Sequence, residues 1–138
     1  MPIFSRRKEQ AVQGFVLKVV NNNCPELRAL IEGPRLDRRV NLTLVVLVVP
    51  VEGKRTRVER AFTAVTKEFS STGTAIVLDG PKHIDEAFLG FRWEGELIFL
   101  RAKAKHLSPM GGGFFQLGFR MQEMIYPGDH PELSELVF

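Results

Sequence analysis

The chain has 138 residues, a length that suits one domain with a buried hydrophobic core. Its hydrophobic fraction of 44% and charged fraction of 25% exclude a disordered chain and predict an ordinary globular protein. The formal net charge is only +3, but it is unevenly distributed. Lys and Arg outnumber Asp and Glu in the first 40 residues, whereas the stretch after Arg120 contains Asp and Glu but no Lys or Arg. The N-terminal part is therefore the better candidate for binding an anion.

Two short helices are predicted at the N-terminus. In residues 5–20, five apolar side chains recur at the spacing of one helix face: Val12, Phe15, Val16, Val19 and Val20. A second helix is expected to begin near Pro25 and to end at Gly33-Pro34. The apolar face of the first helix must either pack on the rest of the chain or dock a second chain, and the sequence leaves both readings open.

From Val40 onward the periodicity changes from helical to alternating, which predicts strands. Glu94-Gly95 suits a two-residue hairpin turn. Between Leu100 and Lys105 small or apolar residues alternate with Arg and Lys, as in a strand with one buried and one solvated face. The expected strands cover residues 40–51, 57–67, 73–79, 88–93, 96–107 and 114–124. Six short antiparallel strands without a long intervening helix indicate a small closed barrel or a sandwich.

The sequence carries no recognisable catalytic or metal-binding motif. Cys24 is the only cysteine, and the three histidines have none of the spacings of zinc sites or catalytic triads. We therefore expect neither an enzyme nor a metal or cofactor site. The longest apolar run, residues 42–51, has half of the roughly 20 residues that a spanning helix needs, and no signal peptide is evident. A cytoplasmic protein without a membrane span is expected.

Two short motifs suggest a ligand site. The stretch "GPRLDRRVNL" (33–42) places Arg35, Arg38 and Arg39 before the first strand, and "KEFSSTGTAIVL" (67–78) places Glu68, Ser70 and Gly73 before a later one. Together they resemble the PilZ domain family, whose pattern is R-x-x-x-R before the first strand and [D/N]-x-S-x-x-G at a later turn. "QLGFRM" (116–121) is similar to the closing strand of that family. The resemblance covers about residues 34–121.

The resemblance implies a six-stranded antiparallel PilZ-type β-barrel that binds the bacterial second messenger cyclic di-GMP and relays it to a protein partner. The expected organisation is an N-terminal helical segment (1–32), the barrel domain (33–126) and a C-terminal tail or short helix (127–138). The implied ligand residues are Arg35, Arg38, Arg39, Glu68, Ser70 and Gly73. Their chemistry suits this ligand, because guanidinium groups bind phosphate in bidentate fashion and a carboxylate accepts the N1 and N2 hydrogens of guanine.

Three alternatives remain open. Glu68 stands where the family has Asp or Asn, and Pro34 where many members have another Arg, so the chain could be a protein-interaction adaptor that keeps the fold without the ligand. A barrel that binds single-stranded nucleic acid through its basic strand and Phe114, Phe115 and Phe119 is the less favoured reading. A homodimer is a further hypothesis, prompted by the apolar helix face.

Overall fold

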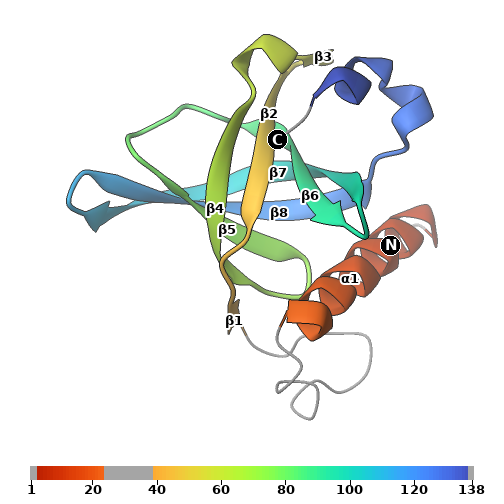
Figure 1. The fold of residues 1–138 in the computed structure, drawn as a ribbon, viewed down its shortest axis with the longest axis horizontal. Helices are drawn as coiled ribbons and strands as arrows, with labels where there is room; N and C mark the ends of the chain where they lie inside the picture. The colour runs from red at the N-terminus through yellow and green to blue at the C-terminus, as the bar shows by residue number, and fades with distance from the viewer. Residues whose placement is uncertain (1–2, 24–38, 137–138) are drawn as a thin grey trace.

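The computed structural model describes residues 3–23 and 39–136. The described part of the chain forms one α-helix, eight strands and three short 3-10 helices (Figure 1). The helix is α1 (Ile3–Asn23), and the strands are β1 (Val40–Asn41), β2 (Val45–Glu52), β3 (Arg55–Thr56), β4 (Phe62–Phe69), β5 (Gly73–Leu78), β6 (Glu86–Trp93), β7 (Glu96–Gly111) and β8 (Phe114–Met124). The 3-10 helices are η2 (Val58–Arg60), η3 (Pro127–Asp129) and η4 (Pro131–Glu135).

Six of the strands close a barrel. They follow the order β2, β4, β5, β8, β7 and β6, and β2 closes the ring by pairing with both β4 and β6. All neighbouring strands are antiparallel, and the two-residue strands β1 and β3 pair with β4 and β2. The prediction of a mainly β, six-stranded antiparallel barrel preceded by an N-terminal helix is confirmed. The second expected helix, near residues 25–32, lies outside the described residues.

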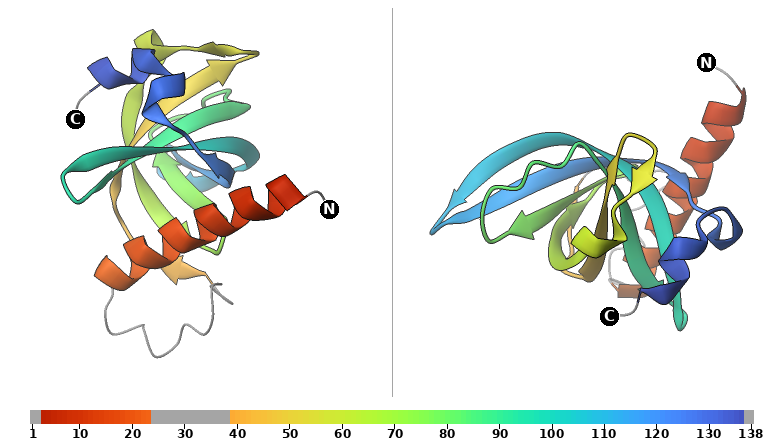
Figure 2. Two further views of the ribbon diagram at one scale, coloured as in Figure 1. Left: turned by 90° about the vertical axis from the view of Figure 1, so that its right-hand side faces the viewer. Right: turned by 90° about the horizontal axis from the view of Figure 1, so that it is seen from above.

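The hairpin turns form where the sequence predicts them. Glu94 and Gly95 join β6 to β7 with φ angles of 50° and 80°, the two left-handed conformations that a type I′ turn requires. Glycine at the second position accepts this conformation without steric cost. The β7–β8 hairpin turns at residues 111–113 and extends beyond the rest of the barrel (Figure 2).

Several of the expected strand bounds are wrong: β6 begins at Glu86 and not at residue 88, β7 ends at Gly111 and not at residue 107, and two further strands differ in their first half. The single strand expected over 40–51 is divided into β1 and β2, because the hydroxyl of buried Thr66 accepts the N–H of Leu44 at 2.8 Å and donates to the C=O of Leu42 at 2.7 Å. These side-chain bonds interrupt the regular ladder, although backbone bonds from Leu42 N–H to the C=O of Lys67 and from Thr66 N–H to the C=O of Leu44 keep residues 42–44 beside β4. The strand expected over 57–67 begins only at Phe62, since residues 58–60 form η2.

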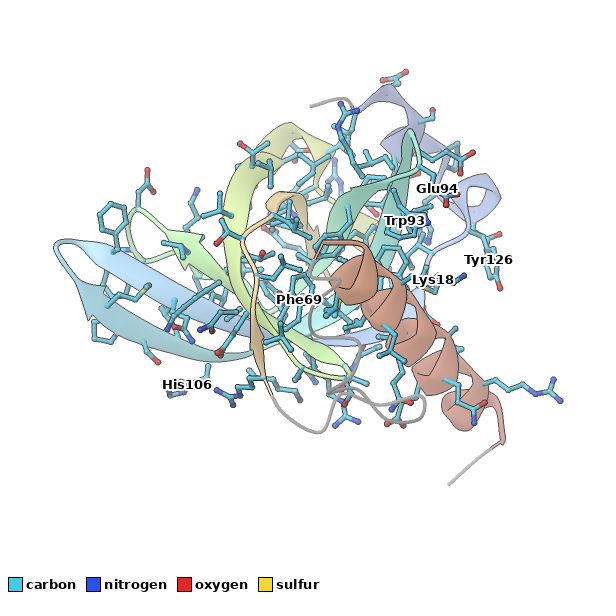
Figure 3. All side chains as sticks on the ribbon, turned by 60° about the horizontal axis from the view of Figure 1, so that its bottom comes forward. Lys18, Phe69, Trp93, Glu94, His106 and Tyr126 are labelled. Atoms are coloured by element: carbon cyan, nitrogen blue, oxygen red, sulfur yellow. The ribbon has the colours of Figure 1, made fainter. Side chains whose placement is uncertain are left out.

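Helix α1 lies across one end of the barrel (Figure 2). The five apolar residues of its predicted face are each at most 8% exposed and belong to the main core, together with the inward side chains of the strands. Phe15 contacts Phe91 and Trp93, with ring centroids 6.1 and 6.2 Å apart. Phe69 lies in the barrel interior close to α1, 5.9 Å from the ring of Phe91 (Figure 3). The apolar helix face is therefore covered by the chain's own barrel.

A second, smaller core lies on the outside of the barrel. It contains Leu47, Val49, Val51, Phe88, Phe99 and, from η4, Leu133. The ring of His130 also packs against Phe88, at a centroid distance of 4.8 Å. The C-terminal 3-10 helices thus cover the outer face of β2 and β6, which explains why β2 is apolar on both faces. The division of the chain at residues 32 and 126 stays a prediction.

Within the described residues, no helix combines the length and the apolar character needed to cross a membrane.

Candidate functional site

The turn between β4 and β5 is built by the second motif. Ser70 N–H donates to the C=O of Gly73 at 2.9 Å, and Gly73 N–H donates to Ser70 Oγ at 3.1 Å. A Cβ atom on Gly73 would lie 2.8 Å from Ser70 Oγ and 3.3 Å from the carbonyl oxygen of Phe119. Glycine is required here by this close approach and not by a left-handed conformation, because Gly73 is not among the residues with positive φ.

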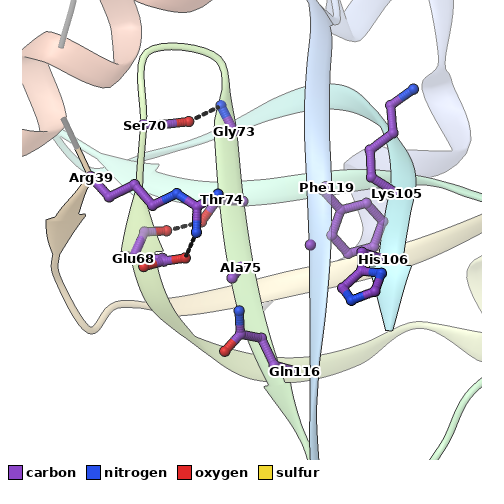
Figure 4. Close-up of a pocket in the computed structure, with 11 residues that line it drawn as sticks. Arg39, Glu68, Ser70, Gly73, Thr74, Ala75, Lys105, His106, Gln116 and Phe119 are labelled. Carbon is purple, nitrogen blue, oxygen red and sulfur yellow. Dashed lines mark hydrogen bonds and ion pairs between the residues drawn. The ribbon is translucent and has the colours of Figure 1, made fainter. Parts of the chain in front are cut away.

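Arg39 and Glu68, which are 29 positions apart, meet at one edge of this turn. The pairing of β1 with β4 places Asn41 opposite Glu68 and Val40 opposite Phe69, which brings Arg39 to the end of β4. Arg39 Nη1 donates to Glu68 Oε1 at 3.2 Å (Figure 4). The guanidinium side chain is 74% exposed and the carboxylate side chain 17% exposed. Arg39 therefore keeps donors available for an incoming anion.

These residues form one wall of a pocket of about 240 Å³ on the outer face of the barrel. Few side-chain atoms fill the bottom of this pocket, because Ala75 and Gly118 lie opposite each other there, on β5 and β8. Lys105 and His106 of β7 form the far wall (Figure 4). The full lining comprises Arg39, Glu68, Ser70, Gly73, Thr74, Ala75, Lys105, His106, Gln116, Gly118 and Phe119.

Four of the six predicted site residues are thus brought together: Arg39, Glu68, Ser70 and Gly73. Arg35 and Arg38 lie outside the described residues. The pocket presents a guanidinium and an ammonium group for an anion, a carboxylate for N–H donors, and a bottom with few side-chain atoms for a flat ring. This combination suits a nucleotide better than a simple anion or an apolar molecule.

The far wall was missed by the sequence reading. Lys105 belongs to the alternating basic strand, so its exposure was predicted, but its position beside the motif residues was not. The ladder between β7 and β8 shifts register between Ala104 and His106, which makes Lys105 the extra residue of a bulge. His106 then lies opposite Gly118, in line with Ala75 and Glu68 across the sheet. The apolar alternation shifts by one position at this bulge, from Ala104 to Leu107, and this shift is the signal in the sequence that could have located it.

The close approach at Gly73 makes a testable prediction. In Gly73→Ala the new methyl group would displace the Ser70 hydroxyl and break its hydrogen bond, so we expect a loss of about 1–3 kcal/mol in the free energy of unfolding. Ser70→Ala/Gly73→Ala removes the obstructing oxygen and should recover part of that loss. Urea denaturation of the parent and both variants measures this, and equal stability of the parent and Gly73→Ala would contradict the described turn.

Comparison with known proteins supports the fold. No protein-family model matches the sequence, and no curated protein matches it. Among solved structures, the chain is similar to the Bacillus subtilis inhibitor of motility (MotI/DgrA), with a TM-score of 0.50 and 19% sequence identity. The match covers 75% of this chain and 48% of that chain, so this chain spans about half the length of that protein. The likeness shows the fold alone, a PilZ-like barrel with an N-terminal helix.

Proposed function

We propose that the chain is a PilZ-type receptor that binds cyclic di-GMP in the pocket between β4, β5, β7 and β8. The observation that carries this proposal is the convergence of Arg39 with Glu68, Ser70 and Gly73, which come from two motifs far apart in the sequence. Polar groups from distant parts of a chain that converge on one concave pocket are typical of a binding site.

Each side of the pocket has a role in this proposal. Arg39 binds a phosphate oxygen or the Hoogsteen edge of guanine, since a guanidinium fork suits both. Glu68 accepts the N1 and N2 hydrogens of the base, which an adenine edge does not offer in the same pattern. The purine face lies over Ala75 and Gly118, where no side chain obstructs it. Lys105 offers a second positive charge across the pocket.

The proposed activity is binding and relay, not catalysis. A relay needs a surface that a protein partner can contact, and an apolar groove of about 420 Å³ lies further along the outer face of β4 and β5. Three of its residues are unusually exposed for apolar side chains: Val45 is 54%, Val65 is 38% and Phe114 is 48% exposed. This groove also favours the second candidate function, a protein-interaction adaptor that works without the ligand.

The three phenylalanines of the nucleic-acid alternative do not form an exposed surface on which bases could stack. Phe119 is 3% exposed and belongs to the main core, and Phe115 is only partly exposed and packs against the same core. Of the three phenylalanines, Phe114 alone presents much of its ring to solvent. Sequence-independent binding of single strands relies on several stacked bases, so one exposed ring supports it poorly.

Calorimetric titration with cyclic di-GMP tests the proposal, with GTP and cyclic di-AMP as controls. We expect saturable heat with cyclic di-GMP and at least tenfold weaker binding of cyclic di-AMP, because the carboxylate of Glu68 would lose its two donors. No heat with any of the three nucleotides would reject ligand binding and leave the adaptor as the better reading.

A further inference from the structure

The candidate pocket adjoins a second pocket on the same face of the barrel. Along β8, side chains alternate between the core and the outer face, and Gln116 and Gly118 line the candidate pocket. The next two outward residues, Arg120 and Gln122, line a pocket of about 330 Å³ that reaches α1. Lys105 lines both pockets. The two pockets therefore lie next to each other along β8, and together they are called the groove.

The part of the groove next to α1 has an excess of positive charge. Its charged lining residues are Lys8, Glu9, Arg101, Lys105, Arg120 and Glu123. The Glu123 carboxylate already pairs with Lys8 Nζ at 2.8 Å and with Arg101 Nη1 at 3.3 Å. Within residues 3–23 and 39–136, neither Lys105 nor Arg120 forms an ion pair. Two exposed cations thus remain to bind an anion, and Thr72 also belongs to the lining.

The size of the candidate pocket suggests what the second pocket holds. At about 240 Å³, it lies below the roughly 300–1,000 Å³ of sites that enclose a drug-sized ligand. A cyclic dinucleotide has two bases and two phosphate groups, so part of it must lie outside this pocket. Of the two neighbouring surfaces, the groove at Val45 and Phe114 is apolar, whereas the pocket at Arg120 is basic.

We propose that the pocket between α1 and β8 is a phosphate-binding subsite, in which Arg120 and Lys105 hold a phosphate group. A dinucleotide spans both pockets, and this part of the inference rests on the proposed function. Because Lys8 of α1 lines the subsite, a phosphate there lies beside a cation of the helix as well as those of the barrel. Binding in the groove would then be sensed by α1, which offers a route from ligand to partner.

The subsite can be tested without the dinucleotide. Inorganic pyrophosphate, titrated into the full chain at constant ionic strength, should produce saturable amide shifts at Thr72, Lys105 and Arg120 in ¹H–¹⁵N NMR spectra. Arg120→Gln should raise the dissociation constant roughly threefold to tenfold, since an exposed charge contributes modestly. Lys54→Gln removes one charge from the turn between β2 and β3 and should leave the constant unchanged. Absent or non-saturating shifts, or equal losses in both variants, would overturn the subsite.

A second titration separates this inference from the proposed function. If the parent binds cyclic di-GMP, Arg120→Gln should weaken that binding roughly threefold to tenfold, and an unchanged constant would overturn the spanning ligand. If the parent does not bind cyclic di-GMP, the proposed function fails, and with it the spanning ligand. The pyrophosphate titration still decides whether the phosphate subsite exists in that case.

Discussion

Arg39→Ala is expected to weaken the binding of cyclic di-GMP roughly tenfold to a hundredfold. Hydrogen bonds to charged groups contribute about 1.5–3 kcal/mol each, and Arg39 is the motif arginine that the structure places in the pocket. The Glu68 carboxylate would also lose its cationic neighbour, which lies 3.2 Å away. The substitution therefore removes the contact between Arg39 and the ligand and also the ion pair that orients Glu68.

The same substitution should scarcely change stability. The Arg39 side chain is 74% exposed, and an exposed ion pair contributes about 0–1 kcal/mol at most. A loss of affinity without a loss of stability would therefore show that Arg39 contacts the ligand and does not hold the fold together. Calorimetric titration gives the dissociation constant, and urea denaturation gives the free energy of unfolding.

Arg60→Ala is the matched control. Arg60 is 56% exposed and pairs with a glutamate, Glu52, as Arg39 pairs with Glu68, but it lies in η2 and does not line the pocket. Loss of this arginine should leave the dissociation constant of cyclic di-GMP unchanged. If Arg39→Ala binds as well as the parent, the pocket is not the binding site, and if both variants lose affinity equally, only the overall charge matters.

The barrel could be predicted from the sequence because its signals are local. Alternation along 96–107 and 114–124 indicates strands, and Glu94-Gly95 indicates the turn that the structure contains. The break between β1 and β2 could not be predicted. It depends on the Thr66 hydroxyl, which lies more than 20 positions away in the sequence and bonds to Leu42 and Leu44. Long-range hydrogen bonds of a single side chain leave no periodic pattern.

Only the wall of the candidate pocket that carries the two motifs could be predicted from the sequence. The two motifs mark Arg39, Glu68, Ser70 and Gly73, and the turn geometry gives a physical reason for the last two. Lys105 and His106 reach the pocket because the barrel closes and because β7 carries a bulge, neither of which can be located in a pattern of basic residues. Positions opposite each other across a closed sheet follow from register, and register is fixed only by the folded structure.

The largest expected effect on stability is that of Phe15→Ala, which should lower the free energy of unfolding by roughly 3–5 kcal/mol. Phe15 is 8% exposed and its ring packs against Phe91 and Trp93 at the end of the barrel. Truncation leaves a cavity between α1 and the strands, because neighbouring side chains of a packed core relax only partly. Small domains are stable by about 5–15 kcal/mol, so the variant would lose a large fraction of its stability.

Phe114→Ala is the matched control for this substitution. It removes the same side chain from the β7–β8 hairpin, where Phe114 is 48% exposed and lies outside both cores, and should change the free energy of unfolding by less than about 1 kcal/mol. Urea denaturation followed by circular dichroism compares the two variants with the parent.

If Phe15→Ala cost no more stability than Phe114→Ala, α1 would not be packed on the barrel in solution. Its apolar face would then be free for a second chain, and sedimentation of the parent would be expected to show a dimer. A large loss in Phe15→Ala alone, with a monomeric parent, instead makes α1 an integral part of the barrel, through which occupation of the neighbouring groove can be sensed.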